Sequence, residues 1–288
     1  MKVVFPLLIS LLFSSYVEAQ EFKSGKSSGQ QDSASVSGVY FPEATPQSQG
    51  VHPASIDRLR QLILGFIDAQ EIVGAEILVI KNRRAIMHEA LGVDDPASSI
   101  PLELDRIYSI RSMTKPLAGA LAQILIDENV IDSDDAVSQY VESFAAASSK
   151  PITIQHLLTH RSGLPMRSPG RLWSDYSSYN SVLQIADYWG NFEPRLGEPG
   201  EAYHYADANV DTLGAVIEKA TGQPAEQLIQ SRILEPLEMS DTIALLKPDD
   251  PRVKRVAGKN GGGRGRWKQF WRWQGQPYFS FPMFAQGY

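Results

Sequence analysis

The order of apolar and polar positions predicts a mixture of helices and short strands. Apolar residues recur every three or four positions over 53–69, as in an amphipathic helix that begins near Pro53. Two short apolar segments, 75–80 and 85–90, flank the polar sequence Lys-Asn-Arg-Arg at 81–84 and predict a β-hairpin. Similar periodicity predicts further helices at 117–126, 154–158 and 210–221.

The order of these elements indicates the fold class. The hairpin precedes most of the helices, which favours an α+β fold over alternating βαβ units. Gly222 follows the helix at 210–221 directly and is expected to cap its C-terminus. The sequence shows no internal repeat.

The first fifty residues are expected to lie outside the folded domain. Residues 1–19 combine Lys2, an apolar run and a small-residue site at Val17-Glu18-Ala19, which predicts a cleaved signal peptide. Residues 20–50 contain a stretch rich in Ser, Gly and Gln, which predicts a flexible linker before a domain over 51–288. The mature protein is therefore expected to be periplasmic or secreted, without stable membrane insertion, although an uncleaved N-terminal anchor is the alternative.

Composition is that of a globular protein, with 43% hydrophobic residues and a net charge of −6. The chain contains no cysteine, which excludes disulfides, thiolate nucleophiles and cysteine metal sites. From Pro251 onward there are eight Lys or Arg residues and no acidic residue, and nine aromatic residues lie over 267–288. This tail could bind single-stranded nucleic acid, but a secreted protein rarely meets that substrate, so we expect no nucleic-acid partner.

Ser112-Met113-Thr114-Lys115 is the first candidate for catalysis. A Ser and a Lys three residues apart share one face of a helix, and free backbone N–H groups at the helix start stabilise negative charge. Pro116 suits a helix that begins close to Ser112. The Lys amine can accept the Ser proton if burial or a cationic neighbour favours its neutral form. Taken alone, the motif is equally compatible with an exposed serine and a solvated lysine.

Four blocks in a fixed order add to this motif, namely Tyr108–Pro116, Thr159–Pro165, Gly197–Asp207 and Leu213–Gly222. Together they resemble the serine β-lactamase-like family, which includes class C β-lactamases, D-alanyl-D-alanine carboxypeptidases and related esterases. The resemblance covers about Val51 to Asp250. It implies a β-lactamase/transpeptidase-like fold, in which an antiparallel sheet is flanked by helices and joined to a helical subdomain.

The resemblance also implies roles for individual residues. Ser112 would be the acyl-accepting nucleophile, and Lys115 its base or an electrostatic partner. Tyr205 would carry the proton between nucleophile and leaving group, unless it is an aromatic packing residue. Asp207 stands where the family has Asn in Tyr-x-Asn, and we place it in the substrate-binding set. Some esterase-like members carry this Asp, whose negative charge argues against β-lactamase activity in particular.

These roles imply a serine hydrolase that forms a covalent acyl-enzyme on an ester, a β-lactam or a D-amino-acid amide. No cofactor or metal is expected, and the partner would be a small-molecule or peptidoglycan-like substrate. The alternative is a non-catalytic cell-wall peptide-binding protein on the same scaffold. His156 and His160 are four residues apart and could bind a metal from one helix face, but no third ligand stands out, so packing is the expected role.

The family's third motif, Lys-Thr-Gly or His-x-Gly on a strand, has no clear counterpart. Lys259-Asn260-Gly261 comes too soon after Tyr205 and is expected in a Gly-rich loop. We therefore expect the chain to be a C-terminally truncated copy. Without the closing strands, one face of the helix at 117–126 would be open to water, and the chain would be poorly stable and poorly active.

Overall fold

A computed structural model describes residues 41–97, 99–145, 151–166, 181–191, 195–243, 249–263 and 265–271. The expected signal peptide, most of the expected linker and the aromatic tail beyond Trp271 lie outside the described residues.

The predicted hairpin forms the centre of a small antiparallel sheet. Strand β1 (Gly74–Lys81) pairs along its full length with the first part of β2 (Arg84–Asp95), and β3 (Ile100–Pro101) pairs with the end of β2 on its other edge. Asn82 and Arg83 form the connection, and both have positive φ, 50° and 58°. Two-residue hairpin turns with positive φ match the twist of the strands, which explains why this short polar segment closes the ladder.

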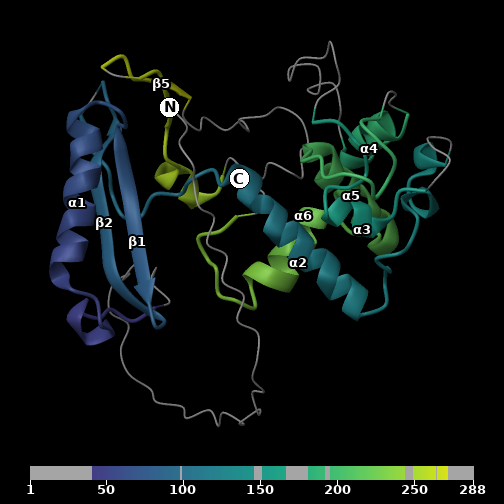
Figure 1. Ribbon diagram of the computed structural model, residues 1–288, viewed down its shortest axis with the longest axis horizontal. Coiled ribbons are helices and arrows are strands. Elements are labelled where there is room, and N and C mark those ends of the chain that lie inside the picture. The colour runs from purple at the N-terminus through teal and green to yellow at the C-terminus, as the bar shows by residue number, and fades with distance from the viewer. Residues whose placement is uncertain are drawn as a thin grey trace, which may run out of the picture. The chain divides into compact units, whose positions relative to one another are not determined.

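Helix α1 (Pro53–Asp68) runs along the β1–β2 ladder (Figure 1). The His52 side chain caps the helix by accepting the backbone N–H of Ala54, and Pro53 occupies the first helical turn, where it needs no donor. Ile56 packs with Ile86 and Met87 of β2 in a core cluster between helix and sheet.

The segment before α1 begins to fold earlier than expected. Residues 41–50, assigned to the linker from the sequence, contain a 3₁₀ turn at Gln47–Gln49. Glu43 forms a parallel bridge with Ala85, and the N–H of Ala44 donates to the carbonyl of Ala85 at 2.9 Å. Backbone hydrogen bonds to β2, which polarity alone does not predict, position this segment.

Strand β1 borders only β2 among the described residues, so its outer edge has no strand partner there. Leu78 and Ile80 on this strand are exposed, at 46% and 41%. An apolar strand with an open edge is a surface on which another strand can add.

A cluster of helices forms the main core of the described residues. Its elements are α2 (Thr114–Asp127), α3 (Ile154–Leu158), α4 (Val182–Gly190), α5 (Asp207–Thr221) and α6 (Ala225–Ile229), with 3₁₀ turns at Val137–Gln139 and Glu142–Phe144 and a π-turn at Gln230–Leu234. Helix α5 contacts α2, α3, α4 and α6, and Figure 1 shows these helices gathered together. Leu213 and Ile217 of α5 are buried in the core, and Gly222 ends α5 with φ 70°, as predicted.

The expectation that α2 leaves an apolar face open to water is wrong. Ala118, Leu121, Ala122 and Leu125 are all at most 2% exposed within the helical core. The other helices cover this face in place of the strands expected there, and two of them, α4 and α6, were not predicted from the sequence.

The triplet Lys259-Asn260-Gly261 is also not in a loop. It forms β4 (Lys259–Gly261), which pairs with β5 (Lys268–Trp271) after a 3₁₀ turn at Pro251–Arg255. The Asn260 amide donates to the carbonyl of Asp94 at 3.0 Å, so this hairpin is held against the end of β2. The strand at Lys259–Gly261 is thus held by a residue that lies 166 positions away in the sequence.

The described residues therefore form an α+β fold of antiparallel strands and packed helices. None of the described helices has the length and apolar character needed to cross a bilayer.

Candidate active site

Ser112 lies at the start of the buried helix α2, as its sequence position predicts. A 3₁₀ turn, Arg111–Met113, leads directly into α2, and the Thr114 hydroxyl donates to the carbonyl of Arg111 at 2.7 Å. Arg111 has φ 52°, a left-handed conformation that costs a bulky residue free energy. The backbone before Ser112 is thus held in a strained turn, which fixes the position of the serine.

Lys115 links Ser112 to a second helix. Its Nζ lies 3.1 Å from Oγ of Ser112 and 2.5 Å from Oδ1 of Asp207, the first residue of α5. The Lys115 and Asp207 side chains are only 9% and 3% exposed, so the charges form a buried ion pair. Such a pair persists because each charge neutralises the other, and the N-terminus of α5 further favours the carboxylate.

Tyr205 completes the set predicted from the sequence. The Nζ of Lys115 lies over the Tyr205 ring, 5.0 Å from its centroid, and the tyrosine is 40% exposed. The structure therefore places Ser112, Tyr205 and Asp207 around the ammonium group of Lys115. A cation over an aromatic face is attracted by the ring quadrupole, which helps to hold the pair together.

The second and third sequence blocks meet beside this group. The N–H groups of Leu196, Gly200 and His204 donate to the carbonyls of Gly163, Arg161 and His160, respectively, at 2.7–2.8 Å. Gly163 has φ 78°, and an added Cβ would lie 2.2 Å from the carbonyl oxygen of Gly197. Only glycine fits at this approach, which explains why Arg-Ser-Gly-Leu and Gly-Glu-Pro-Gly occur together.

His160 contacts Tyr205 and the residue that follows it. Its ring lies 4.7 Å from the Tyr205 ring, and its Nδ1 accepts from the N–H of Ala206 at 3.2 Å. Burial lowers the pKa of His160, and the positive charge of Lys115 lowers it further. His156 instead caps α3, where its Nδ1 accepts from the N–H of Thr153. Among the described residues, no group of three His, Cys, Asp or Glu side chains converges to hold a metal.

Two buried polar residues behind the site were not identified from the sequence. The Ser162 hydroxyl donates to Oδ1 of Asn209 at 2.5 Å, and the Asn209 amide lies 3.0 Å from Nδ1 of His160. Both residues are at most 1% exposed. The available signal was their polarity, since Ser162 lies inside the second quoted block and Asn209 follows the third by two residues.

Lys259 lies near enough to the nucleophile turn to interact with it electrostatically. Burial lowers the pKa of Lys259 to about 8, and the charge of Arg111, next to Ser112, lowers it as well. The Lys259-Asn260-Gly261 triplet, expected in a loop, thus brings the Lys259 side chain close enough to Arg111 for their charges to interact.

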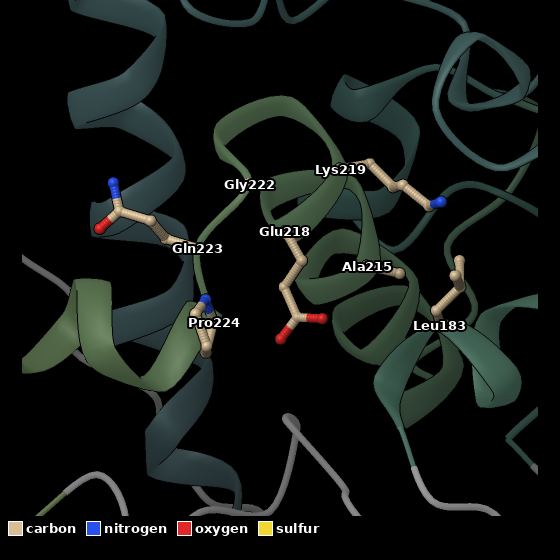
Figure 2. Close-up of a pocket in the computed structure, with 7 residues that line it drawn as sticks. All are labelled: Leu183, Ala215, Glu218, Lys219, Gly222, Gln223 and Pro224. Atoms are coloured by element: carbon tan, nitrogen blue, oxygen red, sulfur yellow. The ribbon is translucent and has the colours of Figure 1, made fainter.

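A cavity of about 300 Å³ lies at the other end of α5 (Figure 2). Leu183, Glu218 and Pro224 line it, and the Glu218 carboxyl points between the other two. None of the residues predicted for catalysis lines this cavity, so it is separate from the Ser112 group.

The fold and this polar arrangement define a protein of the β-lactamase/transpeptidase class. A family model described as Beta-lactamase matches residues 59–282, and the chain belongs to that family.

Individual proteins are similar to this chain over part of their length. The chain is 29% identical to Protein flp of Staphylococcus aureus (strain MW2) over 59% of this chain and 34% of that protein. It is 29% identical to esterase EstB of Burkholderia gladioli over 60% of this chain and 47% of that protein. The chain thus spans a third to a half of these curated relatives. The solved structure of EstCE1, a hydrolase with promiscuous acyltransferase activity, matches with a TM-score of 0.67 at 21% identity, over 82% of this chain and 68% of that one.

Proposed function

We propose that this protein is a serine hydrolase that cleaves carboxylic esters through an acyl-enzyme on Ser112. Membership of the Beta-lactamase family and the similarity to an esterase support a hydrolase in general. The ester as substrate and the covalent step are inferred from the site.

One observation carries the proposal, namely the Lys115 ammonium between Ser112 and Asp207. Its distances are 3.1 Å to Oγ and 2.5 Å to Oδ1, at a position that is nearly closed to water. An exposed serine beside a solvated lysine would need no buried counter-ion, whereas Lys115 has one in Asp207. The arrangement concentrates positive charge at the oxygen that must become a nucleophile, which is how such sites are activated.

The ion pair favours one of the two roles left open for Lys115, that of an electrostatic partner. An ammonium has three donors and no lone pair, so Lys115 paired with Asp207 cannot accept the Ser112 proton. Its charge instead stabilises negative charge on Ser112 and on Tyr205, whose ring it covers. Tyr205 is therefore the group proposed to take the proton, with Lys115 as its electrostatic partner.

The proposed reaction proceeds in two balanced steps. Tyr205 enters the step as a phenolate beside the Lys115 ammonium. Oγ of Ser112 bonds to the ester carbonyl carbon while its proton passes to the Tyr205 oxygen, which then gives that proton to the departing alkoxide and becomes a phenolate again. The alcohol leaves and the acyl group remains on Ser112. Water then attacks the acyl carbon, its proton passes through Tyr205 back to Ser112, and the carboxylic acid is released.

Asp207 favours an ester over an acylamino substrate. The family's asparagine at this position offers an amide donor, whereas a carboxylate offers only acceptors. Since its Oδ1 binds Lys115, Asp207 also brings negative charge close to any substrate carbonyl. This disfavours the recognition of an amide side chain, which β-lactams and D-amino-acid amides share, more than recognition of a simple ester.

Acylation of the full chain by a fluorophosphonate probe tests the proposal. Intact mass should show one adduct in the wild type and in the control Ser109→Ala, and none in Ser112→Ala. Tyr205→Phe should lower p-nitrophenyl butyrate hydrolysis by about 100- to 10,000-fold without loss of fold, as expected for a general acid–base group. Equal labelling of wild type and Ser112→Ala would overturn the proposal and favour the non-catalytic peptide binder.

A further inference from the structure

The imidazole of His160 holds the backbone that follows Tyr205. Its Nδ1 accepts from the N–H of Ala206 at 3.2 Å, and that N–H belongs to the peptide bond formed by the Tyr205 carbonyl. On the other side, the carbonyl of His160 accepts from the N–H of His204 at 2.8 Å. The residue before Tyr205 and the residue after it are therefore both hydrogen-bonded to His160.

A buried network fixes which form of the ring can do this. Oδ1 of Asn209 accepts from the Ser162 hydroxyl at 2.5 Å, so its amide nitrogen faces Nδ1 of His160 as a donor, at 3.0 Å. Two donors, from Ala206 and Asn209, thus point at Nδ1. This nitrogen must carry a lone pair, so the ring is the neutral tautomer with its proton on Nε2.

The ring also contacts the tyrosine directly. The His160 and Tyr205 rings lie 4.7 Å apart with an interplanar angle of 31°, on the tyrosine that Lys115 covers at 5.0 Å. Tyr205 is 40% exposed, so few other packing contacts hold its ring. A proton carrier must be placed to within a fraction of an ångström, and this contact supplies that restraint.

We propose that His160 is the positioning residue for Tyr205, and that protonation of its Nδ1 releases the tyrosine from its catalytic position. The inference rests on the proposed function, because it assumes that Tyr205 carries the proton to and from Ser112. It gives the Thr-His-Arg-Ser-Gly block of this chain a role in the reaction rather than in packing alone.

The charged groups around His160 determine when this release occurs. Lys115 of α2 and Asp207 of α5 face the ring with opposite charges, and the rings of Tyr203 and Tyr205 lie 5.9 Å and 4.7 Å away. Burial and the nearby ammonium of Lys115 favour the neutral ring, against the smaller opposing effect of Asp207. The hold on Tyr205 should therefore persist at neutral pH and be lost only below the ordinary histidine value of 6.5.

Two substitutions distinguish the role of Nδ1 as a hydrogen-bond acceptor from the role of the ring as a packing contact. His160→Asn keeps an acceptor at the Nδ1 position that cannot be protonated, and asparagine tolerates the positive φ of 53° found there. His160→Gln moves the acceptor to the Nε2 position and leaves the Ala206 N–H without its partner. His156→Asn is the matched control, because His156 also accepts a backbone N–H through Nδ1, but from Thr153 at the start of its own helix α3.

The test combines acylation rates with amide hydrogen exchange of the 203–209 peptide, both from pH 4.5 to 8. In the wild type, the acylation rate should fall below pH 6.5. The exchange protection, corrected for the intrinsic pH dependence of amide exchange, should fall with it. His160→Asn, which keeps an acceptor but loses the ring contact, should have a lower rate than the wild type at neutral pH, and its rate and protection should not fall further at low pH. His160→Gln should lose protection and about 10- to 100-fold in rate at every pH. His156→Asn should behave as the wild type.

The outcomes distinguish this inference from the proposed function. Equal protection and equal pH profiles in wild type, His160→Asn and His160→Gln would overturn the positioning role while leaving Ser112 acylation intact. Loss of protection in His160→Gln with labelling that does not depend on Ser112 would instead overturn the proposed function, and with it the catalytic part of the inference.

Discussion

Lys115 and Asp207 are 92 residues apart in the sequence and form a buried ion pair with a 2.5 Å contact between Nζ and Oδ1. This contact joins the first turn of α2, which directly follows the 3₁₀ turn that carries Ser112, to the first residue of α5. The pair therefore has two consequences: it places the ammonium at the nucleophile, and it couples the site to the stability of the helical core.

The stability consequence leads to the first prediction. Asp207→Asn leaves the buried Lys115 ammonium without its counter-charge, which should cost about 3–5 kcal/mol of unfolding free energy. Urea unfolding followed by circular dichroism measures this cost. The control Asp57→Asn breaks a surface pair with Arg60, in which the aspartate is 64% exposed, and should cost at most about 1 kcal/mol.

A double variant tests whether the cost belongs to the pair. Lys115→Met combined with Asp207→Asn removes both charges, so its destabilisation should be smaller than the sum of the two single variants. Additivity to within about 0.5 kcal/mol would show that the two side chains do not stabilise each other in solution.

The burial of α2 leads to a second prediction, opposite to the expectation of an uncovered helix. Leu121 is fully buried, so Leu121→Ala should lower the free energy of unfolding by about 2–5 kcal/mol. Leu62→Ala on α1, where the leucine is 55% exposed, should change it by no more than about 0.5 kcal/mol. Similar effects of the two substitutions would mean that α2 is not packed in the core of the chain in solution.

Local features of the fold could be predicted from the sequence. The turn at Asn82 and Arg83, the start of α1 at Pro53 and the end of α5 at Gly222 each depend on a backbone preference of one or two residues. The grouping of Ser112 and Lys115 also follows from spacing on one helix. These features need no knowledge of which segments meet in space.

Features that depend on distant contacts could not be predicted. The Lys259 triplet becomes a strand because Asn260 bonds to Asp94, 166 residues away. The role of Asn209 depends on Ser162 and His160, which approach only when α5 packs beside α3. The resemblance placed Tyr205 and Asp207 in the site, but not the buried ion pair between Lys115 and Asp207.

The open edge of β1 leads to a third prediction, which concerns self-association. Apolar strands with unpaired backbone groups favour pairing with another chain, and charged residues on an edge oppose it. Leu78→Lys combined with Ile80→Lys should reduce association in sedimentation velocity, at little cost in stability because both residues are exposed. Leu104→Lys, which changes an exposed leucine outside the strands, serves as the control and should leave association unchanged. Unchanged association in the double variant would exclude the β1 edge as the contact.

The cavity at the far end of α5 leads to a prediction about pH (Figure 2). Burial raises the pKa of Glu218, whose Oε1 accepts from the N–H of Ala225 at 3.2 Å, and the charge of Glu226 adds to the shift. The folded chain thus binds this proton more tightly than the unfolded chain. The bound proton of Glu218 makes its full contribution to the free energy of unfolding below the unfolded pKa of about 4.3. This contribution is lost as the pH rises through the raised pKa of the folded state.

Glu218→Gln should therefore become relatively more stable as the pH rises. Glutamine keeps the oxygen that accepts the Ala225 N–H but carries no charge, so it avoids the cost of burying a carboxylate. The melting temperature of the variant, relative to wild type, should increase between pH 4 and pH 8 in differential scanning calorimetry. Glu142→Gln removes an exposed carboxylate from a 3₁₀ turn and should show no such trend. A difference for Glu218→Gln that stays flat or falls with rising pH would mean that the carboxyl is solvated in the folded protein.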